Sequence, residues 1–177
     1  MTMKILISLA LLLLSLHATA SEPSYGPIIK GYGPTYPIAD RDVALRDGFV
    51  YKAVFDAAVY KDEKALNTGL VSVARYLNMH GRNGVPAKNM TIAVVAHGPA
   101  LSALLNDKAY KARYGVENPN TELVARLQAA GVQFYVCGQS MTFGGVDKNE
   151  LAEPAQVALS AMTMLTVLQS DGYALLR

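Results

Sequence analysis

The segment M-T-I-A-V-V-A-H-G-P-A, residues 90–100, decides the fold class of this 177-residue chain. Its first seven residues form an apolar run that only Thr91 interrupts. Such a run is typical of a strand that is covered on both faces, as in parallel sheets. Pro99 is favoured in the first turn of a helix, so a short helix over 100–105 is expected directly after the strand.

Further strands are predicted on both sides of this segment. Upstream, the β-branched and aromatic residues of 49–59 predict a first strand. Downstream, residues 132–136 predict a third strand that ends at Cys137. Weaker patterns predict a fourth strand over 156–160 and a last strand over 173–176.

Apolar residues spaced three and four apart predict helices between these strands. One helix is expected to begin at Asp62 and to end at Gly81, and its apolar stripe comprises Leu66, Leu70, Val73, Ala74 and Leu77. A second is expected to open at Asn118 and Pro119 and to end at Gly131. A third is predicted over 162–169.

The remaining segments are expected to be loops. They are the polar stretch 106–115 and the glycine-bearing segment that follows Cys137. Within the latter, Asp147 and Glu150 have the spacing of a capping box for one helical turn.

Alternation of strands and helices predicts an α/β fold: an open, mostly parallel sheet of about five strands with helices on both faces. Ligands of such sheets bind beyond the carboxyl ends of the strands, where the strand order reverses. His97 follows the second strand and Cys137 ends the third. If these strands are neighbours, the imidazole and the thiol line one crevice.

Composition narrows the possible partners. The chain is 51% apolar and 17% charged, enough for one domain with a substantial core. Lysine and arginine number 16 against 14 acids, and no dense basic run is present, so no nucleic acid is expected as a partner. The histidines and the cysteine lack zinc-site spacing, and no dinucleotide or phosphate-loop motif occurs. Neither a metal nor a cofactor is therefore expected.

Three regions are predicted along the chain. Residues 1–20 resemble a signal peptide, with Lys4, an apolar run over 5–16 and Ala18-Thr19-Ala20 as the cleavage site. About a dozen apolar residues are too few to span a bilayer, which needs about 20, so a periplasmic or secreted product that leaves the membrane is expected. Residues 21–45 predict an extended arm rich in proline, glycine and tyrosine that wraps the domain or a neighbouring subunit, with a flexible tail as the alternative. Residues 46–177 form the α/β domain.

Cys137 is the single cysteine of the chain, although exported proteins usually pair their cysteines. It is therefore a buried inert thiol, half of an intermolecular disulfide, or a reactive group. A thiolate is the nucleophilic form, and positive charge or backbone N–H groups lower the pKa of a thiol. Helices that begin near Pro99 and Pro119 would direct N–H groups to the same rim, which suits a small anion.

Four segments resemble the DsrE/DsrF-like family, in particular its exported, stand-alone members. They are A-V-V-A-H-G-P-A (93–100), Y-G-V-E-N-P-N (114–120), A-A-G-V-Q-F-Y-V-C-G-Q-S-M (129–141) and L-Q-S-D-G-Y-A-L-L (168–176). The resemblance covers roughly residues 49–177, and V-C-G-Q-S is its most specific part. It implies a mainly parallel α/β sheet, homo-oligomers of trimeric or hexameric type, and a cysteine that accepts and hands on sulfur as a persulfide.

Carried over by position, Cys137 is the implied sulfur acceptor, with His97 and Gln139 in its environment. Cys137 and His97 are thus the candidate catalytic residues, and the candidate ligand-binding residues are Gly98, Asn118, Gly138, Gln139 and Ser140. Each also has a structural interpretation: Cys137 as a small buried hydrophobe, His97 as a partner of backbone carbonyls, and the polar residues as turn or cap residues. His80, near a helix C-terminus, is expected to be structural.

The first functional hypothesis is an exported carrier that exchanges sulfane sulfur with a donor or acceptor protein. A lone cysteine cannot resolve a persulfide by an internal disulfide, so the sulfur must leave by attack from another molecule. The alternative is a non-catalytic oligomeric module that binds a small anion or serves assembly. A third possibility, a thiol hydrolase, would require an orienting group for His97 that the sequence does not identify.

Overall fold

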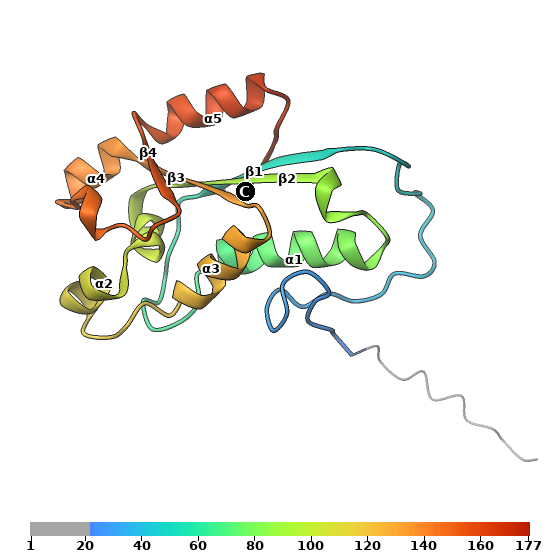
Figure 1. Ribbon diagram of the computed structural model, residues 1–177, viewed down its shortest axis with the longest axis horizontal. Helices are drawn as coiled ribbons and strands as arrows, with labels where there is room; N and C mark the ends of the chain where they lie inside the picture. Colours follow the sequence, from blue (N-terminus) through green and yellow to red (C-terminus); the bar gives the residue numbers. More distant parts are fainter. Residues whose placement is uncertain (1–21) are drawn as a thin grey trace, which may run out of the picture.

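The computed structural model describes residues 22–177, whose centre is a five-stranded sheet (Figure 1). The strands are β1 (Tyr51–Ala57), β2 (Met90–Ala96), β3 (Gln133–Cys137), β4 (Ala155–Ala158) and β5 (Ala174–Leu176). All neighbours pair in parallel, in the order β4-β3-β2-β1-β5. The predicted open, parallel α/β sheet is confirmed. The predicted signal peptide lies outside the described residues.

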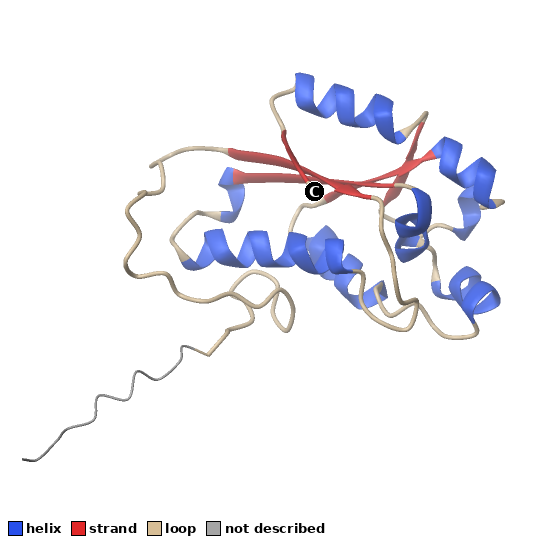
Figure 2. Ribbon diagram, turned by 180° about the vertical axis from the view of Figure 1, so that it is seen from behind, coloured by secondary structure: helices blue, strands red, loops and turns tan. Residues whose placement is uncertain are grey.

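Helices cover both faces of the sheet (Figure 2). Helices α1 (Thr68–Arg82) and α3 (Thr121–Ala129) lie on one face, and α5 (Ala161–Ser170) lies on the other. The remaining α-helices are α2 (Asp107–Tyr114) and α4 (Gly138–Gly144), and the 3-10 turns are η1 (Ala87–Asn89), η2 (Gly98–Leu104) and η3 (Lys148–Glu150). Within residues 22–177, no helix has the length and apolar character to cross a membrane.

The direction of the chain explains this two-sided arrangement. From β1 the chain proceeds through β2 and β3 to β4, and then returns across the sheet to place β5 on the other side of β1. Right-handed crossovers in opposite directions put their helices on opposite faces. The reversal makes β1 the strand at which the order changes, and ligands of such sheets bind beside this point.

Strand β2 supplies the middle of two apolar cores. Its side chains alternate, so Ile92, Val94 and Ala96 pack under α1 and α3, whereas Ala93 and Val95 pack under α5. Each of these five residues is at most 1% exposed. Burial of a valine or isoleucine side chain contributes about 1.5–3 kcal/mol. The predicted strand with two covered faces is therefore present where expected.

Helix α1 begins and ends later than predicted. The Asn67 side chain accepts hydrogen bonds from the N–H groups of Gly69 and Leu70, whereas Asp62 accepts one in a turn five residues earlier. The predicted start at Asp62 is therefore wrong. Gly81 does not end the helix, which continues to Arg82. A Cβ at Gly81 would approach Ile28 Cδ1 to 2.7 Å, so the glycine makes room for the N-terminal arm.

Two segments predicted as loops are helical. Helix α2 occupies most of 106–115, capped by Asn106, whose side chain accepts from the Ala109 N–H at 2.9 Å. It buries only Ala109 and Tyr110, so the sequence carries no apolar stripe. Helix α4 starts directly after Cys137. Helix α3, by contrast, begins later than expected, at Thr121 and not at Asn118.

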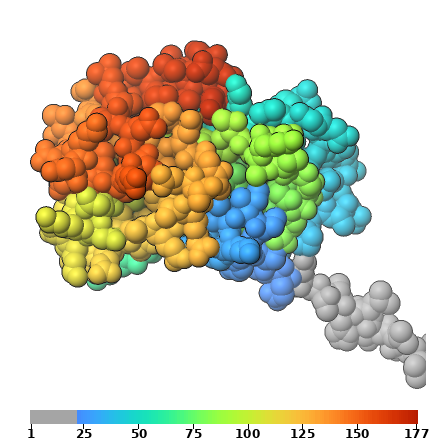
Figure 3. Space-filling view, in the orientation of Figure 1, coloured from blue at the N-terminus to red at the C-terminus, as the bar shows by residue number. Residues whose placement is uncertain are grey.

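The N-terminal arm folds back onto α1 of its own chain, and its blue residues pack against the body of the molecule in Figure 3. Ile29 is buried, and Asn78 of α1 serves as its anchor. The Asn78 side chain accepts from the N–H groups of Ile28 and Ile29, at 3.0 and 2.7 Å. It also donates to the carbonyls of Ile29, Tyr32 and Gly33. One amide group thus satisfies the backbone of a segment that has no regular secondary structure.

We expect Asn78→Ala to destabilise the protein by about 3 kcal/mol or more, because several buried backbone groups lose their partner at about 1–3 kcal/mol each. Denaturant unfolding measures this loss, and limited proteolysis should show faster cleavage within residues 22–36. The matched control is Asn149→Ala, since Asn149 is exposed and its side chain is a partner in none of the hydrogen bonds described for residues 22–177. Equal stability of the two variants would contradict the anchoring role.

Candidate functional site

Three chemically capable side chains lie at the carboxyl edge of the sheet. Asp56 is near the end of β1, His97 follows β2, and Cys137 ends β3. In the strand register, Asp56 pairs with Val95 and Ala96 pairs with Val136. His97 and Cys137 therefore lie one position beyond the last β2–β3 pair, on neighbouring strands. The predicted proximity of the two strand ends is present.

The three side chains share one face of the sheet. Alternation places Asp56 with Val54, and His97 with Val95, on the face that α5 covers. Cys137 belongs to the same small core beneath α5. Because adjacent strands lie about 4.8 Å apart, the three groups form a row across the sheet.

Cys137 is the residue that caps helix α4. Its sulfur accepts a hydrogen bond from the Ser140 N–H at 3.4 Å. The expected glycine-bearing loop after Cys137 is thus a helix, and the thiol is held at its first turn. Cys137 is 5% exposed, so the sulfur is largely covered in the isolated chain.

Gly138 lets this helix start close to the edge strand. A Cβ at this position would lie 2.8 Å from the carbonyl oxygen of Ala158 and 3.3 Å from that of Leu159. No side chain fits between α4 and the end of β4. The absence of a side chain at Gly138 therefore permits the close approach of α4 to β4.

Ser140 connects the carboxyl ends of β2 and β3. Its hydroxyl accepts a hydrogen bond from the Gly98 N–H at 3.1 Å, while its own N–H contacts the Cys137 sulfur. Gly98 has a φ of +52°, a left-handed conformation that glycine adopts without strain. This turn after His97 is what directs the Gly98 N–H toward α4.

An open pocket of about 550 Å³ lies beside this junction. Three of the candidate ligand-binding residues, Gly98, Gln139 and Ser140, contribute to its lining. The full lining is Gly98, Pro99, Gln139, Ser140, Phe143 and Gly144. It contains no charged side chain, and α3, which was expected to direct N–H groups here, is not part of it.

Asn118 does not line this pocket. It is buried, and its side chain donates to the carbonyls of Ala103 and Leu105 and accepts from the Asn120 N–H. These contacts hold the segment before α3 in place, where it borders a different pocket.

His97 has a carboxylate partner that sequence reasoning missed. Its Nε2 lies 2.8 Å from Asp56 Oδ1, and the side chains are 30% and 16% exposed. Asp56 also lies 3.8 Å from the guanidinium of Arg177. The signal available in the sequence was an acid near the end of an otherwise largely apolar strand. The importance of Asp56 depends on the pairing of β1 with β2, which brings it to His97.

Hydrogen bonding favours the thiolate of Cys137. Burial raises the pKa of the thiol, but hydrogen bonds from the Ser140 side chain and from backbone groups of Ser140, Ala161 and Gln139 lower it by more. The net pKa lies below its ordinary value. A larger fraction of thiolate, the nucleophilic form, is therefore available near neutral pH.

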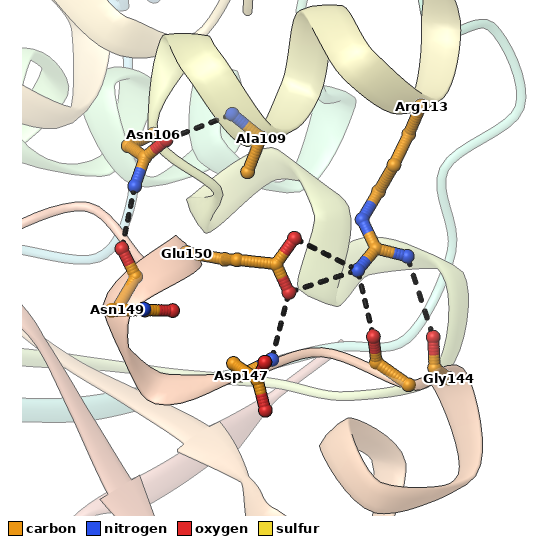
Figure 4. A network of polar contacts seen from close by, with 8 residues as sticks. Asn106, Ala109, Arg113, Gly144, Asp147, Asn149 and Glu150 are labelled. Atoms are coloured by element: carbon orange, nitrogen blue, oxygen red, sulfur yellow. Dashed lines mark hydrogen bonds and ion pairs between the residues drawn. The ribbon is translucent and has the colours of Figure 1, made fainter.

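The far end of α4 is tied to α2 (Figure 4). The Arg113 guanidinium donates to the carbonyls of Gly144 and Gly145 and pairs with Glu150 at 2.9 Å. Glu150 in turn accepts from the Asp147 N–H at 2.8 Å, the expected contact of the capping box. Both ends of the helix that carries the thiol are thus fixed.

The other histidine of the described residues, His80, contacts two aromatic rings. The His80 ring packs at a tilt against the rings of Tyr51 and Tyr76, and its Nδ1 lies 2.8 Å from the Tyr76 carbonyl oxygen. Within residues 22–177, His, Cys, Asp and Glu form no group of three or more that could hold a metal ion.

Two solved structures are similar to this chain. A protein of unknown function from Methanobacterium thermoautotrophicum, MTH1491, is 23% identical with a TM-score of 0.55, covering 72% of this chain and 98% of that one. The ychN protein from E. coli is 15% identical with a TM-score of 0.50, covering 71% and 96%. At these identities the likeness shows the fold alone. No match was found among curated proteins.

The family model described as "DsrE/DsrF-like family" matches residues 51–177. This range contains the whole sheet, all five α-helices and the row of Asp56, His97 and Cys137. It excludes the N-terminal arm. The chain therefore belongs to the DsrE/DsrF-like family, which is associated with sulfur relay.

Proposed function

We propose that this protein is an exported sulfur carrier that takes up sulfane sulfur on Cys137 as a persulfide and passes it to a partner. The observation that carries the proposal is the sulfur of Cys137 at the first turn of α4, where it accepts the N–H of Ser140. Ser140 lines an open pocket to which Cys137 itself does not contribute. Family membership supports sulfur handling, and the pattern of residues 1–20 supports export.

The proposed uptake of sulfur by Cys137 needs no oxidant, because its atoms and electrons balance. Cys137 loses its thiol proton, and the thiolate attacks the outer sulfur of a donor persulfide, R–S–SH. A new bond to Sγ forms while the donor S–S bond breaks, and its electron pair leaves on RS⁻. That thiolate takes up a proton, so the products are Cys137–S–SH and RSH.

Release of the sulfur then requires a second molecule. Cys137 has no other cysteine in the chain with which to form a disulfide. An attacking thiol of a partner must therefore remove the outer sulfur, which describes a carrier. Because Cys137 is largely covered, exchange also requires a local opening at the pocket rim.

Incubation of the purified protein with inorganic polysulfide should add the mass of at least one sulfur atom, and a reducing thiol should remove it. Cys137→Ala should gain none, because the acceptor is absent. Intact-mass spectrometry measures both proteins. An unchanged mass for the native protein, or an equal gain in the variant, would overturn the proposal.

Ser140→Ala should move the pH midpoint of Cys137 alkylation upward, because a hydrogen bond that favours the thiolate is lost. A hydrogen bond to a charged group is worth about 1.5–3 kcal/mol, so alkylation near pH 7 should slow about tenfold or more. Ser140→Thr keeps a hydroxyl and is the matched control. A midpoint that stays in place in Ser140→Ala would contradict this account of the thiol.

A second candidate function, oligomeric assembly, rests on an exposed apolar surface around the site. Phe143, Leu159 and Met162 are 96%, 71% and 77% exposed. Residues 155–170, which form β4 and α5, contain no charged side chain. Because β4 is an edge strand, its outer edge is open to pairing. We propose that a second copy of this chain, with the same uncharged surface, covers it in a homo-oligomer.

The double variant Leu159→Asp, Met162→Asp should reduce the assembled mass in sedimentation, since charges would be buried without partners. We expect at least a tenfold weaker association. Val43→Asp, at an equally exposed apolar residue of the arm region, is the control. A native protein that sediments as a monomer at high concentration, or a double variant of native mass, would refute assembly through this surface.

A further inference from the structure

The contact between Asp56 and His97 is the shortest polar contact in the row at the carboxyl edge. Asp56 Oδ1 and His97 Nε2 are 2.8 Å apart, and the Asp56 side chain is 16% exposed. Arg177 approaches the other carboxylate oxygen at 3.8 Å but is itself 79% exposed. Exposed ion pairs of this kind contribute little, so the main partner of Asp56 is His97.

We propose that Asp56 is a positioning residue that fixes one tautomer of His97, so that Nδ1 can accept the thiol proton of Cys137. This inference rests on the proposed sulfur transfer. It adds a proton acceptor for the first step and names the residue that orients it.

The tautomer follows from the chemistry of the contact. An ionised carboxylate only accepts hydrogen bonds, so Nε2 must be the nitrogen that carries the proton. In the neutral ring, Nδ1 then has a free lone pair. Within residues 22–177 no hydrogen bond to His97 Nδ1 is present, from Cys137 or from any other group, so its lone pair is free. Proton transfer therefore requires the imidazole and the thiol to come together during the local opening that sulfur exchange needs.

The position of the ring follows from the sheet. The His97 backbone N–H donates to the Ala57 carbonyl at 2.9 Å, which continues the β1–β2 pairing beyond the last strand residue. His97 and Cys137 occupy adjacent register positions on the same face. The Ser140 bridge between Gly98 and the Cys137 sulfur holds these two strand ends together.

The topology gives a second, independent reason to expect function at Asp56. The strand order reverses at β1, and Asp56 lies near the carboxyl end of that strand, between His97 of β2 and Arg177 after β5. This is the place where α/β sheets of this type bind their ligands.

The proton balance of the proposed transfer is then complete. His97 Nδ1 takes the proton from Cys137 as the thiolate attacks the donor. The imidazolium, held by the Asp56 carboxylate, gives the proton to the leaving RS⁻. His97 returns to its starting form, and no proton needs to come from solvent.

Asp56→Asn tests the proposal, because an amide can donate to Nε2 and so favours the opposite tautomer. In ¹⁵N NMR of the purified protein, we expect native His97 to be protonated at Nε2 and the variant to shift toward Nδ1–H. General-base catalysis is typically worth about 10²–10⁴-fold, so sulfur uptake by the variant should slow at least tenfold. Asp56→Glu should restore part of the rate, and Asp171→Asn, at an exposed acid, should change neither readout.

The two proposals fail in different ways. If native protein loads no sulfur on Cys137, sulfur transfer is wrong, and the positioning role is lost with it. If native protein loads sulfur and Asp56→Asn loads it equally fast, only the role of Asp56 is overturned. An Nδ1-protonated His97 in the native protein would also overturn it. Thermal unfolding of each variant shows whether a slower rate reflects loss of the fold.

Discussion

Parallel pairing of β2 with both of its neighbours fixes the place of every reactive group in this protein. Both faces of β2 are buried in apolar cores, so a shift of one residue would exchange the side chains of the two faces and disturb the packing of both cores. The same register sets His97 beside Cys137 and within reach of Asp56. The interactions that stabilise the sheet are thus those that assemble the site.

Strong periodic patterns made the fold predictable from the sequence. The apolar run of β2 reflects burial on two faces, and the strand lies where expected. The stripe of α1 reflects burial on one face, and four of its five predicted residues are buried in the helix, which starts after Leu66. Helix α2 has no such pattern, because it is mostly solvated and depends on its Asn106 cap and the Arg113 contacts. Sequence periodicity indicates burial, so it does not predict helices that are stabilised mainly by polar contacts.

The site was predictable in part for the same reason. His97 and Cys137 follow apolar strands, so their place at the carboxyl edge could be inferred. Asp56 could not be identified, because its partner is 41 residues away and is defined only by strand pairing. The glycines after Cys137 suggested a loop, whereas Gly138 is needed for the contact with β4 and Gly145, with a φ of +58°, ends α4.

The uncharged lining of the pocket has a consequence for how a small ligand would reach it. Long-range steering requires a field of one sign at the entrance, and neither Pro99, Phe143 nor Gln139 provides one. The nearby Arg113 cation is neutralised by Glu150. The residues that line this entrance therefore add no steering of their own that would favour an anionic ligand over a neutral one.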